Sequence, residues 1–343
     1  MSSLVEKIVL EPSPSYPLYT LATRHSIGPR DTYNSSDLVL ICLHAVGCHK
    51  EAWDPTIDHL FNLERKSLHR HGRIREVYSI DCPNHGESAI VNAEILNTHY
   101  KDSWTTREYA RAVYAFLMAG PTRGAKVDFR KRRIVVVGHC LGAVASFFMH
   151  ELNPPIRLEA VIAFDPAFSP GLDYPDYREV FRKFQYWTWL RPSVWPSRKA
   201  ALKDLRERPL YKTWDPAVLR SFVEHGLSDH PGSKYPEPYK FSGVVMSTTK
   251  EQEAATYRSD DFVGEPMEAL RMTASKTPVH LIWGKIEDIL PNHLKYTISN
   301  HTNLASVEYI EEAGHLIVQQ KPRLVAEKIH DRILLLNSAR AVL

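Results

Sequence analysis

Short apolar runs, separated by polar turns, recur along the chain and predict buried strands. Runs of consecutive apolar residues, many of them β-branched, are typical of strands that are covered on both faces. Residues 38–43 and 134–137 are unbroken runs of this kind, and strand-like segments at 75–80, 158–164, 279–283 and 305–310 complete a series of six. Before them, alternating stretches within residues 5–24, interrupted by prolines, predict a short antiparallel hairpin at the edge of the sheet.

Helix-like patterns lie between these runs. In residues 104–118, apolar or aromatic side chains recur on one helical face, at positions 109, 112, 113, 116 and 117. A small apolar segment at 143–149 and an amphipathic one at 322–336 are further candidates. Because strands and helices alternate, the sequence predicts an α/β fold whose mainly parallel, doubly wound sheet carries helices on both faces.

The alternation stops in the second half of the chain. Between about residues 171 and 266 the sequence is rich in Trp, Tyr, Phe, Arg and Pro, with helical pieces at 177–190 and 197–208. We predict that residues 171–266 form a helical cap inserted into a core. That core would consist of residues 1–170 and 267–343.

The composition is ordinary for a globular chain and narrows the range of partners. Of the 343 residues 43% are hydrophobic and 24% charged, and the formal net charge is only +3, which gives no reason to expect a nucleic-acid partner. No window reaches the roughly 18 apolar residues of a membrane span. The first residues lack the apolar core of a signal peptide. We therefore expect no integral membrane segment and a cytoplasmic location.

The chain ends in Ala-Val-Leu rather than the peroxisomal address S-K-L, so a peroxisomal location would need another route.

The cysteine and histidine patterns give no sign of a metal site. The four cysteines show no C-x-x-C spacing, and the 17 histidines include no H-E-x-x-H pattern. We expect free thiols, no metal site and no cofactor.

Residues 138–142, Gly-His-Cys-Leu-Gly, join the run at 134–137 to the segment at 143–149. The pattern is that of the G-x-S-x-G nucleophile elbow, with cysteine in the serine position. Since a sharp turn from strand to helix brings neighbouring backbone very close, the flanking positions must lack side chains. The helix that follows would direct its N-terminal N–H groups at Cys140 and favour the thiolate. Cys140 is the candidate nucleophile, and a buried structural cysteine between glycines is the alternative.

The run at 38–43 ends in His44-Ala45-Val46-Gly47, shortly before Trp53. Hydrolases of the elbow type place their second oxyanion donor in such a strand-to-helix loop. We expect the backbone N–H groups of Val46 and Leu141 to form the oxyanion hole. His44 is expected to order the loop rather than to react.

Five segments resemble those of capped α/β hydrolases, and they occur in the same order as in that family. They are HAVG, DCPNHGES, GHCLGA, WGKIEDILP and EAGHL. The resemblance extends from about residue 38 to 336 and implies the α/β-hydrolase fold. Residues 197–227 are similar to a fungal and bacterial branch of lipases, esterases and toxin-biosynthesis hydrolases, some of which are peroxisomal.

The resemblance also implies a base and an acid that follow the nucleophile. His315, in A-G-H-L after the last predicted strand, is the candidate base. Glu287 holds the fourth position of W-G-x-x-D, 28 residues before His315, and is our first choice for the acid. Asp165, in D-P-A at the end of the preceding strand, is the main alternative, because some lipases draw their acid from there. Asp288 is the third candidate.

Cysteine at position 140 departs from the serine found in most of the family, and three explanations compete. The chain is a genuine cysteine enzyme, as in dienelactone-type hydrolases and some thioesterases; or it is a serine enzyme whose nucleophile has been exchanged; or it has lost catalysis. We favour the first explanation, because the histidine, the acid and the oxyanion loop are all retained.

The predicted function is acyl transfer through an acyl-cysteine intermediate. The substrate would be an apolar, polyketide-like ester or thioester of secondary metabolism, either a free small molecule or one bound to a carrier protein. The product would be a free acid or, by closure onto the substrate's own hydroxyl, a lactone. Trp187, Trp189 and Trp195 of the cap are expected to contact this substrate. The alternative is a non-catalytic protein of the same fold that binds a small apolar ligand.

Overall fold

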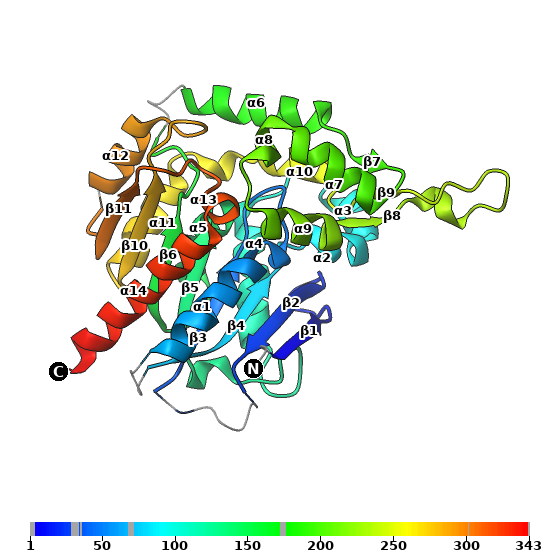
Figure 1. Cartoon of the computed structure of the whole chain (residues 1–343). Helices are drawn as coiled ribbons and strands as arrows, with labels where there is room; N and C mark the ends of the chain where they lie inside the picture. Colours follow the sequence, from blue (N-terminus) through cyan, green and yellow to red (C-terminus); the bar gives the residue numbers. More distant parts are fainter. Residues whose placement is uncertain are drawn as a thin grey trace.

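The computed structural model describes residues 4–28, 34, 36–67, 72–171, 176–300 and 302–341. Its central feature is an eight-stranded sheet with the strand order β1-β2-β4-β3-β5-β6-β10-β11 (Figure 1). The strands are β1 (Leu4–Leu10), β2 (Thr20–Ser26), β3 (Leu38–Leu43), β4 (Ile74–Ile80), β5 (Arg133–His139), β6 (Leu158–Phe164), β10 (Val279–Gly284) and β11 (Ser306–Ile310).

The sheet confirms the predicted fold class. From β4 to β11 every neighbouring pair is parallel, whereas β1 and β2 form an antiparallel hairpin at one edge. All six predicted runs are strands of this sheet, and each differs from its predicted bounds by two residues or fewer at either end. The three predicted core helices correspond to α4 (Thr106–Met118), α5 (Leu141–Phe148) and α14 (Pro322–Ala341).

Helices cover both faces of the sheet, and alternate side chains of a strand pack against the helices of opposite faces. On β3, side chains 38, 40 and 42 belong to one apolar cluster, with residues of α1 (Asp54–Lys66) and α14. Side chains 39, 41 and 43 belong to the opposite cluster, with residues of α4, α5, α11 (Glu265–Ala274) and α12 (Asn292–Asn300). In Figure 1, α1 and α14 lie side by side on one face. Burial on both faces explains why unbroken apolar runs mark these strands.

The segment between β6 and β10 has its own small core. Its helices are α6 (Asp176–Leu190), α7 (Arg198–Glu207), α8 (Pro209–Lys212), α9 (Pro216–His225) and α10 (Lys250–Tyr257), followed by α11. It also holds an antiparallel sheet in the order β7-β9-β8, made of β7 (Val194–Trp195), β9 (Val244–Met246) and β8 (Leu227–Asp229). The sequence predicted helices here but not this sheet. The chain between β8 and β9 extends away from the rest of the molecule (Figure 1).

The cap core lies against the loop that follows β3. Trp195, Trp214 and Phe222 are buried together with Ala45 and Cys48 of that loop. Within the described residues, no helix is both long and apolar enough to cross a membrane. Short helices α2 (Gly86–Val91), α3 (Ala93–His99) and α13 (Ile317–Gln320) follow β4 and β11. The division into core and cap at residues 171 and 266 stays a prediction.

Candidate active site

Cys140 occupies a sharp turn between β5 and α5. Its backbone has φ 52° and ψ −115°, a conformation that is rare for a residue with a side chain and typical of strained functional turns. A Cβ atom at Gly138 would lie 2.4 Å from Ala143 Cα, and one at Gly142 would lie 2.4 Å from Leu43 O. Both glycines are therefore required by close backbone approach, as the elbow pattern predicts.

Cys140 is also the accessible thiol of the described chain. Cys42, Cys48 and Cys82 are buried, whereas Cys140 is half-buried and packs at the edge of the cap core. Burial raises the pKa of the Cys48 thiol to about 12, and it holds those of Cys42 and Cys82 above their ordinary range. These three thiols stay protonated, which leaves Cys140 as the reactive candidate.

The loop after β3 is fastened to the elbow. Gly142 N–H donates to His44 O at 3.1 Å, so the loop containing Val46 runs beside the start of α5. Val46 and Leu141 follow the two partners of this contact closely along the chain, and their role as oxyanion donors stays a prediction.

His44 orders the loop. Its Nε2 accepts from Cys82 N–H at 2.9 Å and its Nδ1–H donates to Ala45 O at 2.8 Å, so both ring nitrogens are used. Burial lowers its pKa to about 3, with the nearby positive charge of Lys50 acting in the same direction. The ring is neutral at ordinary pH and serves the loop, in agreement with the supporting role predicted for it.

His315 lies on the loop after β11 and contacts Asp165. Its Nδ1–H donates to Asp165 Oδ1 at 2.6 Å, and both side chains are almost completely buried. Burial acts against the charged ring, but the negative charge and hydrogen bonding of Cys140 and of Asp165 raise the pKa of His315 to about 10. The structure therefore brings Cys140, His315 and Asp165 together.

Glu287, our first choice for the acid, does not contact His315 in this structure, which places Asp165 there instead. The Glu287 side chain is exposed and accepts from Asn292 N–H at 3.2 Å, not from His315. Asp288 contacts the histidine only through the backbone, where its Oδ1 accepts from His315 N–H at 2.9 Å. A Cβ atom at Gly314 would lie 2.0 Å from Asp288 Oδ2, so Asp288 shapes the loop rather than the imidazole ring.

The physical reason lies in the sheet. β6 and β10 are adjacent and parallel, so Asp165 and Glu287 both follow carboxyl ends at the same edge. Asp165, with φ 42°, turns its carboxylate back toward β10, where Gly284 N–H donates to Oδ2 at 2.7 Å. Burial alone would raise the pKa of Asp165, but His315 and the positive charge of Lys295 hold it below its ordinary value.

Two neighbours of this group were missed by sequence reasoning. His139, inside the elbow pattern itself, donates from Nε2–H to His315 O at 2.8 Å, and burial lowers its pKa to about 3. Lys295 lies on α12 with Nζ 3.7 Å from Asp165 Oδ2. His139 could have been found from its place beside Cys140; no pattern in the sequence marks Lys295.

The three cap tryptophans differ in their exposure. Trp195 is buried in the cap core, where its Nε1–H donates to Asp204 at 2.9 Å. Trp187 and Trp189 are about half exposed on α6, at 53% and 46%. Trp195 belongs to the cluster against which Cys140 packs, and the expectation that the three tryptophans contact the substrate stays a prediction.

A different cap feature approaches the oxyanion loop. Glu253 of α10 is buried, and its carboxylate lies 3.4 Å from the position of a Cβ atom at Gly47. Arg191, just after α6, forms a two-pronged ion pair with Glu253, and Thr188 donates to the same carboxylate at 2.9 Å. The cap thus contacts the loop that holds Val46 through a charge-compensated group.

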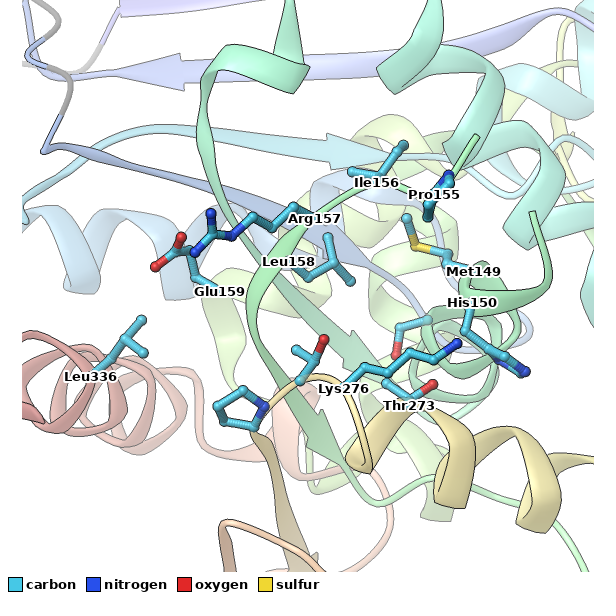
Figure 2. Close-up of a pocket in the computed structure, with 13 residues that line it drawn as sticks. Met149, His150, Pro155, Ile156, Arg157, Leu158, Glu159, Thr273, Lys276 and Leu336 are labelled. Atoms are coloured by element: carbon cyan, nitrogen blue, oxygen red, sulfur yellow. The ribbon is translucent and has the colours of Figure 1, made fainter. Parts of the chain in front are cut away.

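A hollow of about 480 Å³ lies away from Cys140, His315 and Asp165. It is bounded by Met149, Arg157, Lys276 and Leu336 (Figure 2), together with Pro278, which precedes β10. These residues flank the amino ends of β6 and β10, the sheet edge opposite Asp165. It is not part of the Cys140 group. Within the described ranges, no three His, Cys, Asp or Glu side chains are placed to hold a metal ion.

Comparison with known proteins places the chain beside hydrolases. A family profile described as "Alpha/beta hydrolase family" matches residues 40–328. The type I acyl-CoA thioesterase mpaH of Penicillium brevicompactum is 26% identical over 238 residues, which are 66% of this chain and 49% of that protein. The chain spans about half the length of the thioesterases of this kind that it matches.

Two solved structures show the same fold. The peroxisomal alpha-beta-hydrolase Lpx1 of Saccharomyces cerevisiae superposes with a TM-score of 0.73 at 16% identity, covering 98% of this chain and 90% of that one. The thioesterase domain from the curacin biosynthetic pathway gives a TM-score of 0.65 at 13% identity, covering 96% and 99%. At these identities the likeness concerns the fold alone.

Proposed function

Since the chain belongs to the α/β hydrolase family, we propose that it is a cysteine-dependent esterase or thioesterase with Cys140 as its nucleophile. The observation that carries the proposal is the placement of a half-buried elbow cysteine against His315, whose ring is bound by Asp165. In this proposal His315 is the base and Asp165 the acid. Val46 and Leu141 supply the oxyanion hole.

The proposed reaction has two steps. His315 takes the proton of Cys140, and the raised pKa of the ring favours the resulting imidazolium beside a thiolate. The thiolate attacks the acyl carbonyl, and the oxyanion is bound by two backbone N–H groups, each worth about 3 to 4 kcal/mol in comparable sites. The leaving group takes a proton from His315. Water, activated by the same ring, then hydrolyses the acyl-cysteine.

Asp165 has a defined task in both steps. It accepts the Nδ1–H of His315, which turns Nε2 toward Cys140 and stabilises the imidazolium. Because its pKa is held below the ordinary value, the carboxylate stays ionised while the proton moves between sulfur, ring and leaving group.

The substrate class is proposed from the relatives. The matched Penicillium proteins carry the name acyl-CoA thioesterase, and one structural neighbour is a biosynthetic thioesterase domain. We assign to this chain an apolar acyl thioester, bound to coenzyme A or to a carrier protein, in secondary metabolism. Because an acyl-cysteine is itself a thioester, transfer to a hydroxyl of the substrate, giving a lactone, stays thermodynamically favourable in addition to hydrolysis. The proposal keeps a cytoplasmic location, with the peroxisome, named for the yeast relative Lpx1, as the alternative.

Steady-state hydrolysis tests the proposal. The wild-type protein is assayed with medium- and long-chain acyl-CoA esters, including hydroxylated ones, beside Cys140→Ala and Cys140→Ser. Turnover in the wild type that is abolished in Cys140→Ala supports the proposal, and the product separates hydrolysis from lactone formation. Turnover restricted to Cys140→Ser would show that the cysteine replaces a native serine. Absence of turnover in all three, with ligand binding retained, would favour a non-catalytic role.

A further inference from the structure

Lys295 is a completely buried lysine next to Asp165, the proposed acid, on the side away from His315. Its side chain, on α12, has 0% exposure, and Leu294 and Ile298 of the same helix belong to the apolar core. Nζ donates to Gly284 O at 2.6 Å and lies 3.7 Å from Asp165 Oδ2. The N–H of Gly284 donates to that same Oδ2 at 2.7 Å. Lys295 and Gly284 therefore hold one oxygen of Asp165, and His315 holds the other.

A buried ammonium group is expensive unless a charge of opposite sign compensates it. The loss of hydration destabilises the charged form, and a carbonyl contact alone does not compensate for this loss. Within the described residues, Asp165 is the carboxylate that lies within 4 Å of Lys295 Nζ. The chain thus keeps a costly cation beside the one side-chain carboxylate that contacts the His315 ring.

We infer that Lys295 is a positioning residue that holds Asp165 ionised and fixed toward His315. The inference rests on the proposed function, because it concerns the acid of the same group. Cys140, His315, Asp165 and Lys295 form a line of alternating charges when the proton is on the ring, so the buried group is neutral as a whole.

Burial favours the protonated form of Asp165, and the positive charge of Lys295 favours the ionised form. The groups that face Asp165 are His315 from the loop after β11, Lys295 from α12, the N–H of Gly284 from β10, and His139 from β5. His139 is neutral at ordinary pH, so Lys295 and His315 supply the positive charge. Without Lys295, Asp165 would take up a proton at higher pH, lose its hold on Nδ1–H, and release the ring from its orientation toward Cys140.

Two substitutions separate this electrostatic role from a structural one. Lys295→Gln keeps a donor for Gly284 O but removes the charge, whereas Lys295→Met removes both. An opposite charge at this distance shifts a carboxyl pKa by roughly one to three units. We therefore expect the acidic limb of kcat/KM to move upward by about one pH unit or more in both variants. Lys295→Gln should have a higher melting temperature than Lys295→Met, but the acidic limb of kcat/KM should be shifted in both.

The readout must also be independent of substrate. The rate of alkylation of Cys140 by iodoacetamide, followed by intact-protein mass spectrometry, reports formation of the thiolate. Cys140→Ala measures the background from the three buried cysteines. Lys50→Gln is the matched control, because Lys50 is another buried lysine, with Nζ 3.2 Å from Asp81 Oδ2, and Asp81 does not contact His315. It is expected to lower the melting temperature without moving the alkylation limb.

The outcomes are distinguishable. An upward shift of the acidic limb in Lys295→Gln and Lys295→Met, absent in Lys50→Gln, supports the role of Lys295. The same shift in alkylation, with no turnover of any acyl thioester by the wild type, would overturn the proposed function and leave the role of Lys295 standing. A limb that stays at the wild-type position while the melting temperature falls, with rescue by glutamine, would overturn the inference and show that Lys295 only ties α12 to β10.

Discussion

Two buried histidines in the loops beside the elbow, His44 and His315, have opposite properties. His44 in the oxyanion loop and His315 in the acid–base loop are 1% and 3% exposed, yet the pKa of the first is lowered to about 3 and that of the second raised to about 10. Each lies in a region that also holds a buried Lys–Asp pair, Lys50 with Asp81 and Lys295 with Asp165. Burial and residue type are therefore alike, and neither explains the difference.

The hydrogen-bond partners explain it. His44 binds backbone groups through both ring nitrogens, so its neutral form fits and burial decides the pKa. His315 binds a carboxylate and lies beside a thiol that is able to become negative, so its charged form is compensated. A histidine becomes a proton carrier here through the charge of its neighbours, not through its depth in the protein.

Replacing each histidine with glutamine should give the largest difference in kcat between the two regions. His315→Gln removes the proton carrier and should lower kcat about 10⁴-fold or more. His44→Gln disturbs the bond to Cys82 N–H and should cost about 1 to 3 kcal/mol of the free energy of unfolding, with a far smaller loss of kcat. Acyl-CoA hydrolysis and urea denaturation measure the two effects. Equal losses of kcat in both variants would contradict the assignment of roles.

The two candidate acids, Asp165 and Glu287, should give the next largest difference in kcat. Asp165→Asn keeps the shape of the side chain but no longer favours the correct tautomer of His315, and should lower kcat about 10³- to 10⁴-fold. Glu287→Gln is the matched control, because Glu287 is exposed and contacts Asn292; its kcat should change less than about twofold. A large loss in Glu287→Gln with activity retained in Asp165→Asn would restore the acid expected from the sequence.

A smaller effect is expected where the elbow meets the oxyanion loop. In Gly142→Ala the new Cβ would collide with Leu43 O at the end of β3, which should cost about 1 to 3 kcal/mol of the free energy of unfolding and lower kcat. Gly171→Ala is the control, since no heavy atom lies within 4 Å of its Cβ position, and it should change stability by less than about 0.5 kcal/mol. Thermal denaturation compares the two; equal stability would mean that the elbow tolerates a side chain there.

The pH dependence of stability distinguishes the two histidines by its sign. The pKa of His44 is lowered from 6.5 to about 3, so its contribution is present above pH 6.5 and is lost as the pH falls toward 3. The pKa of His315 is raised from 6.5 to about 10, so its contribution is present below pH 6.5 and is lost as the pH rises toward 10.

Melting temperatures across this range test both signs. His44→Gln should lose less stability than the wild type on acidification, and His315→Gln should lose less on alkalinisation. Differences of several degrees are expected, because each kcal/mol shifts the melting temperature of a large domain by roughly 2 to 4 °C. Parallel curves for all three proteins would mean that neither histidine changes its protonation on unfolding.

The parts that the sequence revealed are those fixed by local chemistry. Unbroken apolar runs mark strands buried on two faces, as at 38–43, and the spacing of Gly138 and Gly142 marks a turn with no room for side chains. The loop-ordering role of His44 is also expected from its place at the end of a buried strand. Each of these features depends on a few consecutive residues.

The parts that the sequence did not reveal depend on contacts between distant segments. Asp165 and Glu287 end neighbouring parallel strands, so spacing cannot decide which carboxylate turns toward His315. Trp195 contributes to a core inside the cap, and aromatic composition does not distinguish such a core from the lining of a site. The strands β7 to β9 have only two or three residues each, too few to leave a period in the sequence.

The central claim is that Cys140 carries the acyl group, and trapping that intermediate tests it most directly. The protein is mixed with an acyl-CoA, quenched with acid at successive times and analysed by intact-protein mass spectrometry with peptide mapping. We predict one acyl adduct on the peptide containing Cys140 that appears and decays as product forms. Product release with no adduct on Cys140, or an adduct retained in Cys140→Ala, would contradict the claim.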